Sequence, residues 1–176
     1  MGTGGRRQCL LLAIFLLLAM LPLIVTYGEG VGDRPSGVEY GLAIVVNRAN
    51  PIENLSSAEL RNIFLGTRSH WQNGRRIAVT MLDYERPERK AVLRQIYRMD
   101  ESGYRNHFLQ EVYRGDVFYA PKTLASPAVM RKFIFNAPAA IGYLRSSDVD
   151  ETVKVLRVDG YLPDDKGYPL QIDEPM

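Results

Sequence analysis

The chain has 176 residues, of which 46% are hydrophobic and 24% charged, and its formal net charge is +2. Two of its 22 basic side chains, and none of its 20 acidic ones, precede Glu29, so the remainder is electrically neutral. That balance gives no support for a nucleic-acid-binding or membrane-surface protein. The only cysteine, Cys9, lies near the N-terminus, which excludes disulfides, thiolate metal sites and cysteine nucleophiles from the rest of the chain.

Residues 1–28 have the layout of a signal peptide. Two arginines precede an uncharged apolar run from Cys9 to Val25, which Pro22 interrupts. The run is shorter than the roughly 20 residues that a membrane-spanning helix needs, and we expect cleavage near Gly28. An uncleaved N-terminal anchor is the alternative, because no clean A-x-A site is present. In both cases the domain is exported, to the periplasm or the outside, and meets the membrane only through this segment.

Residues 29–40 are rich in glycine and poor in large apolar side chains, which is typical of a flexible lead-in. We expect the folded domain to span residues 41–160. Its first strand is predicted at Leu42–Asn47, a continuous apolar run of the kind that is buried on both faces of a sheet. Ser56 and Glu59 fit a capping box and therefore predict a helix, which Gly66 is placed to end.

The middle of the chain alternates between strand and helix patterns. A second buried strand is predicted at residues 76–82, followed by a turn and a helix with Pro87 in its first turn and an acidic residue as its cap. A further amphipathic helix is predicted from Asp100 to Arg114, with Gly115 as its end.

The last third continues the alternation. Ser126 is a predicted N-cap before Pro127, and strands are expected at residues 140–144 and 152–158. Residues 161–176 contain three prolines and several acids and are expected to form an exposed C-terminal tail. The alternation predicts an α/β fold, a three-layer sandwich with a mainly parallel sheet covered on both faces.

Three stretches, in order, resemble the phosphate-type family of periplasmic substrate-binding proteins. Residues 60–67 read LRNIFLGT and are followed by Trp71 and Asn73-Gly74, similar to the family's helix ending in IFxGK. Residues 76–79 then lead into a loop and helix, and residues 136–144 read NAPAAIGYL, similar to the family's PGAIGY strand entry. The resemblance covers roughly residues 42–158. It implies one lobe of a periplasmic-binding-protein-like (type II) fold.

The chain also departs from that family. Phosphate-binding members have two lobes around a cleft, and this chain is long enough for one. They carry an SGT-type turn at a helix N-terminus after the second strand, where this chain has Leu82-Asp83-Tyr84-Glu85-Arg86-Pro87-Glu88. Proline removes an N–H donor and the glutamates repel an anion, so the family's phosphate site cannot be carried over to that turn.

Asp83, Arg86 and Ser126 are the candidate ligand-binding residues. The guanidinium of Arg86 could clamp an anion, and the alternative is that it belongs to a solvated block of mixed charge from Glu85 to Lys90. Ser126 could donate to an oxyanion, although a plain N-cap explains it without a ligand.

No catalytic, metal or cofactor motif is present in the sequence. His70 and His107 lack the further ligands that a zinc site needs, and no G-x-S-x-G elbow, P-loop or dinucleotide fingerprint occurs. The sequence therefore predicts neither an enzyme nor a bound cofactor.

A group of aromatic residues in the middle of the chain allows two readings. They either build the core of the helical layer or, together with nearby arginines, form a partner-binding face. The aromatic residues are Tyr97, Tyr104, Phe108, Tyr113, Phe118 and Tyr119, and the arginines are Arg94, Arg98, Arg105 and Arg114.

The resemblance implies an exported receptor component, related to phosphate ABC transporter substrate-binding proteins, that binds a small oxyanion. The partners it implies are phosphate or another oxyanion, an ABC transporter or other envelope protein, and a second copy of the chain that completes the cleft. The alternative is an envelope interaction or regulatory module that keeps the scaffold and has lost the small ligand.

Overall fold

The computed structural model describes residues 40–172, which lie within one compact unit of the chain. The predicted signal peptide, nearly all of the lead-in and the last four residues lie outside the described residues. Among the described helices, none is long and apolar enough to cross a membrane.

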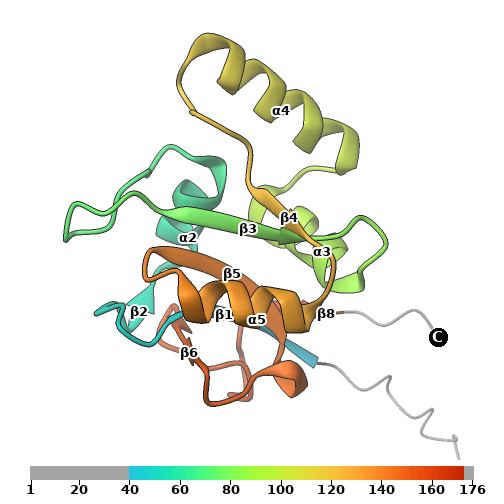
Figure 1. Cartoon of the computed structure of the whole chain (residues 1–176). Helices are drawn as coiled ribbons and strands as arrows, with labels where there is room; N and C mark the ends of the chain where they lie inside the picture. Colours follow the sequence, from blue (N-terminus) through green and yellow to red (C-terminus); the bar gives the residue numbers. More distant parts are fainter. Residues whose placement is uncertain (1–39, 173–176) are drawn as a thin grey trace, which may run out of the picture. The chain divides into compact units, whose positions relative to one another are not determined.

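A six-stranded sheet forms the centre of the domain (Figure 1). Its strand order is β4 (Lys122–Leu124), β3 (Ala78–Leu82), β5 (Ala140–Arg145), β1 (Tyr40–Asn47) and β6 (Val153–Val155), and β8 (Gln171–Ile172) also pairs with β1. The pairs β3–β4 and β3–β5 are parallel, whereas β1 runs antiparallel to β5, β6 and β8. Strand direction is therefore the same in every strand except β1, and the predicted mainly parallel α/β sheet is confirmed.

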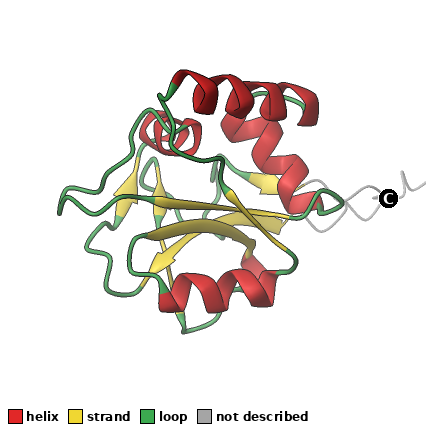
Figure 2. Cartoon of the chain, turned by 45° about the horizontal axis from the view of Figure 1, so that its top comes forward, coloured by secondary structure: helices red, strands yellow, loops and turns green. Residues whose placement is uncertain are grey.

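Helices cover both faces of this sheet (Figure 2). One face carries α5 (Pro127–Asn136), and the other carries α2 (Ser57–Leu65), α3 (Pro87–Val92) with the π-helix η1 (Leu93–Tyr97), and α4 (Glu101–Arg114). A short 3-10 helix, η2 (Ser146–Asp148), follows β5, and β2 (Asn54–Leu55) pairs with β7 (Arg157–Val158) outside the main sheet. The three-layer arrangement matches the expectation.

The helix ends follow from local sequence. Ser56 and Glu59 form the predicted capping box, and Gly66 ends α2 at φ 85°, a left-handed conformation that glycine adopts without strain. Asp100 caps α4 by accepting from the Gly103 N–H at 2.7 Å, and Gly115 ends that helix in the same left-handed conformation.

The start of α3 differs from the expectation. Pro87 is in the first turn as predicted, but the N-cap is Arg86 and makes no side-chain capping bond, so the predicted acidic cap is wrong. The helix then widens into η1, where Arg61 donates to the carbonyls of Ile96 and Tyr97 at 2.8 Å each. Those carbonyls lie at the open end of the helix, and the guanidinium satisfies them.

Residues 161–176 were expected to form an exposed tail; residues 164–167 are exposed, but for residues 168–172 the expectation is wrong. Tyr168, Leu170 and Ile172 are buried, β8 pairs with β1, and the Tyr168 hydroxyl donates to the Leu42 carbonyl at 2.8 Å. The predicted strand at 152–158 is two short strands, because β6 pairs with β1 whereas β7 pairs with β2.

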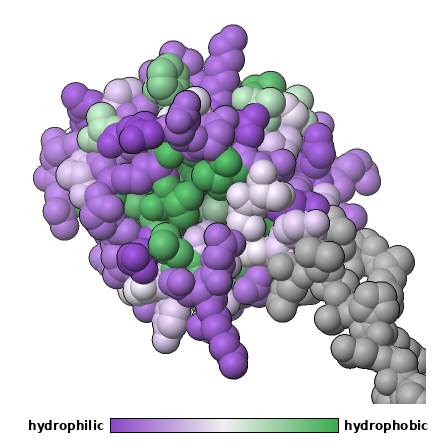
Figure 3. Space-filling view, turned by 90° about the horizontal axis from the view of Figure 1, so that it is seen from below, coloured by the Kyte–Doolittle hydropathy of each residue, from purple (hydrophilic) through white to green (hydrophobic). Residues whose placement is uncertain are grey.

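The core fills the space between the sheet and both helical layers. Strand β1 is buried along almost its whole length, as its continuous apolar run predicted. Apolar surface also remains outside the core: Figure 3 shows an apolar area, surrounded by hydrophilic atoms, on the face seen from below.

Candidate functional site

The turns that follow β3 and β4 lie side by side at one edge of the sheet. The two strands are parallel and in register, with Leu82 opposite Leu124, and the Asp83 N–H donates to the Leu124 carbonyl at 3.1 Å. Asp83 and Arg86 follow β3, and Ser126 follows β4. The structure therefore brings all three predicted residues to the same carboxyl edge, where open α/β sheets bind ligands.

Asp83 and Arg86 belong to one tight turn. The Asp83 carboxylate accepts from the Tyr84 N–H at 2.8 Å, and its carbonyl accepts from the Arg86 N–H at 3.2 Å. Arg86 is half-buried, and its guanidinium has no hydrogen-bond or ion-pair partner among residues 40–172. An unpaired guanidinium next to a helix start is free to receive an anion.

Ser126 caps α5 as predicted. Its side-chain oxygen accepts from the Val129 N–H at 3.3 Å, and the first turn of α5 contains no acidic residue. The N-terminal end of this helix therefore keeps its partial positive charge without a carboxylate from its own turn.

The N-terminal end of α3 is different because it holds a carboxylate of its own. Glu88 lies in the first turn, is 3% exposed and pairs with Arg145 at 3.2 Å between Nε and Oε1. The second carboxylate oxygen of Glu88 is buried without a hydrogen-bond partner. The Glu88 carboxylate thus already occupies the N-terminal end of α3, and the α5 end is the one without a carboxylate in its first turn.

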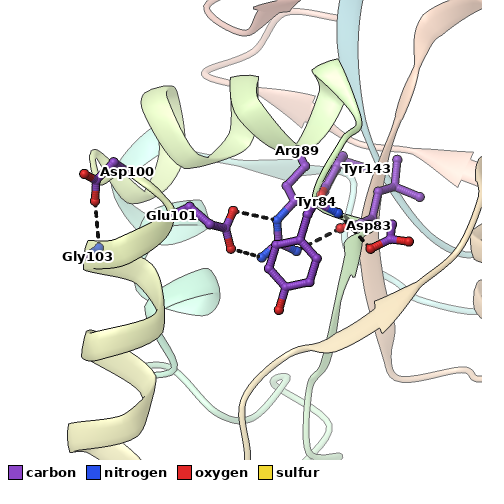
Figure 4. Close-up of polar contacts among 8 residues, drawn as sticks. Asp83, Tyr84, Arg89, Asp100, Glu101, Gly103 and Tyr143 are labelled. Carbon is purple, nitrogen blue, oxygen red and sulfur yellow. Dashed lines mark hydrogen bonds and ion pairs between the residues drawn. The ribbon is translucent and has the colours of Figure 1, made fainter.

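A buried arginine that the sequence interpretation missed lies behind the turn (Figure 4). Arg89 is 1% exposed and binds Glu101 through two bonds, Nε to Oε2 at 2.9 Å and Nη2 to Oε1 at 2.6 Å. Its third bond runs from Nη1 to the Leu82 carbonyl at 2.8 Å. Burial opposes the charged form of Arg89, but the hydrogen bonds and charge of Glu101 raise its pKa above the ordinary value. The pair ties α3, α4 and the end of β3 together.

Two neighbouring groups complete this cluster. The Arg89 guanidinium lies 4.5 Å from the ring centre of Tyr84, and the Leu82 N–H donates to the Tyr143 hydroxyl at 2.8 Å. Burial raises the pKa of Tyr143, so this phenol stays neutral at physiological pH. The end of β3 is thereby fixed from both sides.

The charged residues from Glu85 to Lys90 were interpreted as a solvated surface block. This is right for the two ends of the block and wrong for its middle. Glu85 and Lys90 are exposed, whereas Glu88 and Arg89 are buried. Helical spacing could have revealed Arg89, because it lies three and four residues before the buried Val92 and Leu93.

No group of three or more potential metal ligands occurs in the described part of the chain. The Nδ1 atom of His70 lies 2.9 Å from the Ser69 hydroxyl, and His107 Nε2 lies 3.4 Å from the Leu65 carbonyl. Both histidines thus have ordinary local contacts.

The core reading of the aromatic set is right for half of it, and for the exposed half the partner-binding reading stays a prediction. Tyr97, Tyr104 and Phe108 are buried and pack on one another, with 5.0 Å between the ring centres of Tyr97 and Tyr104. Tyr113, Phe118 and Tyr119 are 91%, 74% and 59% exposed.

Comparison with known proteins identifies relatives of one kind. The chain is 30% identical over 138 residues to the phosphate-binding protein PstS of Bacillus subtilis (strain 168), an alignment that covers 74% of this chain and 41% of that protein. No family model matches the chain. The resemblance to phosphate-type substrate-binding proteins, stated from three short motifs, is confirmed.

Solved structures support the same fold. A putative phosphate ABC transporter substrate-binding protein from Clostridium perfringens, with bound phosphate, superposes with a TM-score of 0.63 at 18% identity, covering 76% of this chain and 53% of that one. An ABC-type phosphate transport receptor from Vibrio cholerae gives 0.58 at 23% identity, covering 71% and 48%. The chain thus spans about half the length of these relatives, or less, and corresponds to a single lobe.

Proposed function

From this resemblance, we propose that the chain is a receptor component that contributes one wall of an oxyanion site, with phosphate as the first ligand to test. The observation that carries the proposal is that Arg86 and Ser126 follow the adjacent parallel strands β3 and β4 at one edge of the sheet, where α5 begins without a carboxylate in its first turn.

The chemistry of these two residues suits a small oxyanion. The Arg86 guanidinium offers several N–H donors in one plane, and no carboxylate of residues 40–172 pairs with it. Ser126 caps α5, where Pro127 has no N–H and the Val129 N–H bonds to Ser126, so the positive charge at this end comes from the Ala128 N–H and the helix dipole. Asp83 is the one anionic candidate, and it would accept a hydrogen bond from a protonated oxyanion such as monohydrogen phosphate.

In a single lobe, the carboxyl edge that carries Arg86 and Ser126 has no second wall opposite it. A second lobe, supplied by an envelope partner or by a second copy of this chain, would complete the cleft. The relatives named above are substrate-binding proteins, and we assign this chain no catalytic role. With a cleaved or anchoring N-terminal segment, the receptor would work in the periplasm or outside the cell and would deliver its ligand to an ABC transporter.

Thermal unfolding of the full-length protein in mild detergent, with and without phosphate or sulfate, tests the site. A ligand that binds only the folded state at 100 times its dissociation constant stabilises it by about 2.7 kcal/mol. We expect a saturable rise in Tm with phosphate, larger than with sulfate, that is lost in Arg86→Ala and in Ser126→Ala.

Matched controls separate binding from folding. Ser56→Ala removes an equivalent N-cap far along the chain from this edge, and Arg75→Ala removes an exposed arginine. Both variants should keep the phosphate-dependent shift. If neither anion raises Tm beyond an ionic-strength control, the receptor assignment is wrong for the chain alone, and an envelope interaction module becomes the better account.

A further inference from the structure

A groove that borders the anion edge at Tyr84 lies between α4 and the segment that leads into β4. It encloses about 480 Å³, within the size range of binding clefts, and Thr123 of β4 forms part of its wall. Most of its lining is aromatic or aliphatic, including Tyr84, Phe108, Leu109, Val112, Phe118 and Tyr119. We refer to it as the α4 groove.

The α4 groove concentrates the exposed apolar surface of the domain. Nine large apolar side chains of the described residues are strongly exposed, and five of them line this groove. Leu109 is 70% and Phe118 74% exposed. Exposed apolar side chains gathered along one groove mark an interaction site.

An unpaired strand edge borders the same groove. Strand β4 is the outermost strand next to β3, and within the described sheet nothing pairs with its other side. Because the Leu124 carbonyl accepts from the Asp83 N–H, the N–H and C=O of the adjacent Thr123 point away from β3. Thr123 therefore offers one donor and one acceptor to an incoming strand.

The charges around the β4 edge favour a negatively charged partner. Glu101 is the only carboxylate that lines the groove, and Arg89 neutralises it. Arg105, also in the lining, has no hydrogen-bond or ion-pair partner in residues 40–172. On the opposite face of β4, the Lys122 ammonium lies 4.9 Å from the centre of the Phe133 ring of α5. Both faces of the edge thus present a positive charge.

We propose that the α4 groove and the β4 edge bind an extended segment of a partner protein, which adds to β4 as a further strand. Alternate side chains of such a strand point to opposite faces. Its apolar side chains enter the α4 groove, its carboxylates on the opposite face lie toward Lys122, and Arg105 adds positive charge on the groove side. The inference uses none of the anion-site residues and does not depend on the proposed receptor function.

The test selects ligands from a display library of random twelve-residue peptides, using the full-length protein in mild detergent. We expect the enriched peptides to alternate apolar and acidic residues. Synthetic copies labelled with fluorescein then give dissociation constants by anisotropy. Thr123→Pro removes the outward N–H while the bonds to β3 remain, and Arg105→Glu reverses the charge; each should weaken binding at least about tenfold, the equivalent of 1.4 kcal/mol.

Three control variants make the result specific. Thr123→Val keeps the backbone N–H, Tyr113→Ser removes an exposed aromatic side chain of α4 that does not line the groove, and Arg75→Glu reverses a charge elsewhere. All three should bind like the original protein, and unchanged unfolding curves for Thr123→Pro and Arg105→Glu exclude a folding defect.

Several results would overturn the proposal. Enrichment of basic or helical amphipathic peptides, no enrichment at all, or equal affinity for Thr123→Pro and Thr123→Val would each do so. A concentration-dependent dimer that Thr123→Pro abolishes would show that the occupant is a second copy of this chain instead of a different protein.

Discussion

The ion pair between Arg89 and Glu101 leads to an asymmetric prediction. Arg89 is buried, with its side chain 1% exposed, whereas the Glu101 side chain is 38% exposed. Removing the exposed partner leaves a buried charge behind, and removing the buried partner leaves a carboxylate that water can reach. We therefore expect Glu101→Leu to destabilise the domain more than Arg89→Met does.

The sizes follow from what each change leaves unsatisfied. Glu101→Leu deprives a buried guanidinium of two hydrogen bonds and its counter-charge, which costs about 3–5 kcal/mol. Arg89→Met leaves the Leu82 carbonyl without this donor, which costs about 1–3 kcal/mol. The double variant should be more stable than Glu101→Leu alone, because no unpaired buried charge remains.

Urea unfolding followed by circular dichroism measures these free energies of unfolding. Arg68→Met is a suitable control, since Arg68 pairs with Glu59 near the surface and such pairs contribute about 1 kcal/mol or less. Equal losses in the two single variants, or additive losses in the double variant, would refute the assignment of a buried charge to Arg89.

Three further predictions follow from packing and burial. Gly142→Ala places a Cβ 2.5 Å from Thr80 Oγ1, so we expect it to lower the free energy of unfolding by about 1–3 kcal/mol or more, measured by urea unfolding. Burial raises the pKa of Tyr143 and of Tyr168 above its value in the unfolded chain. The stability that the neutral phenols contribute is therefore present below a pH of about 10 and lost above it. Unfolding curves recorded from pH 8 to 11 measure this loss. Tyr168→Phe should cost about 1 kcal/mol at pH 7 and flatten that alkaline loss, and an unchanged pH profile would contradict the burial of this phenol.

Local signals in the sequence predicted most of the elements. The Ser56 capping box, the serine and proline before α5, and Gly66 and Gly115 each mark a helix end through their own backbone chemistry, and each has that role in the structure. The candidate edge was predictable only in part, because Asp83 follows a strand that the apolar pattern located and the Ser126 cap was predicted, whereas the short strand β4 before Ser126 was not.

Features that depend on distant contacts were not predictable in this way. The continuous apolar run of β1 shows burial on both faces but carries no information about direction, and β1 is antiparallel to its neighbours. Arg89 looks solvated within a run of charges until α4 supplies Glu101. In the C-terminal segment, prolines and acids obscured the alternation of the buried Tyr168, Leu170 and Ile172.

The pairing of β1 with β8 has a consequence for how this domain can be connected to other chains. Tyr40 lies opposite Ile172, so the first and last described residues are neighbours in one antiparallel pair (Figure 1). A domain that enters and leaves at one point can be inserted into a surface loop of a host protein without stretching the host. Joining its ends with a short linker and opening the chain at the Asn73-Gly74 turn should likewise give a circular permutant with the same sheet, because the new opening falls outside the strands.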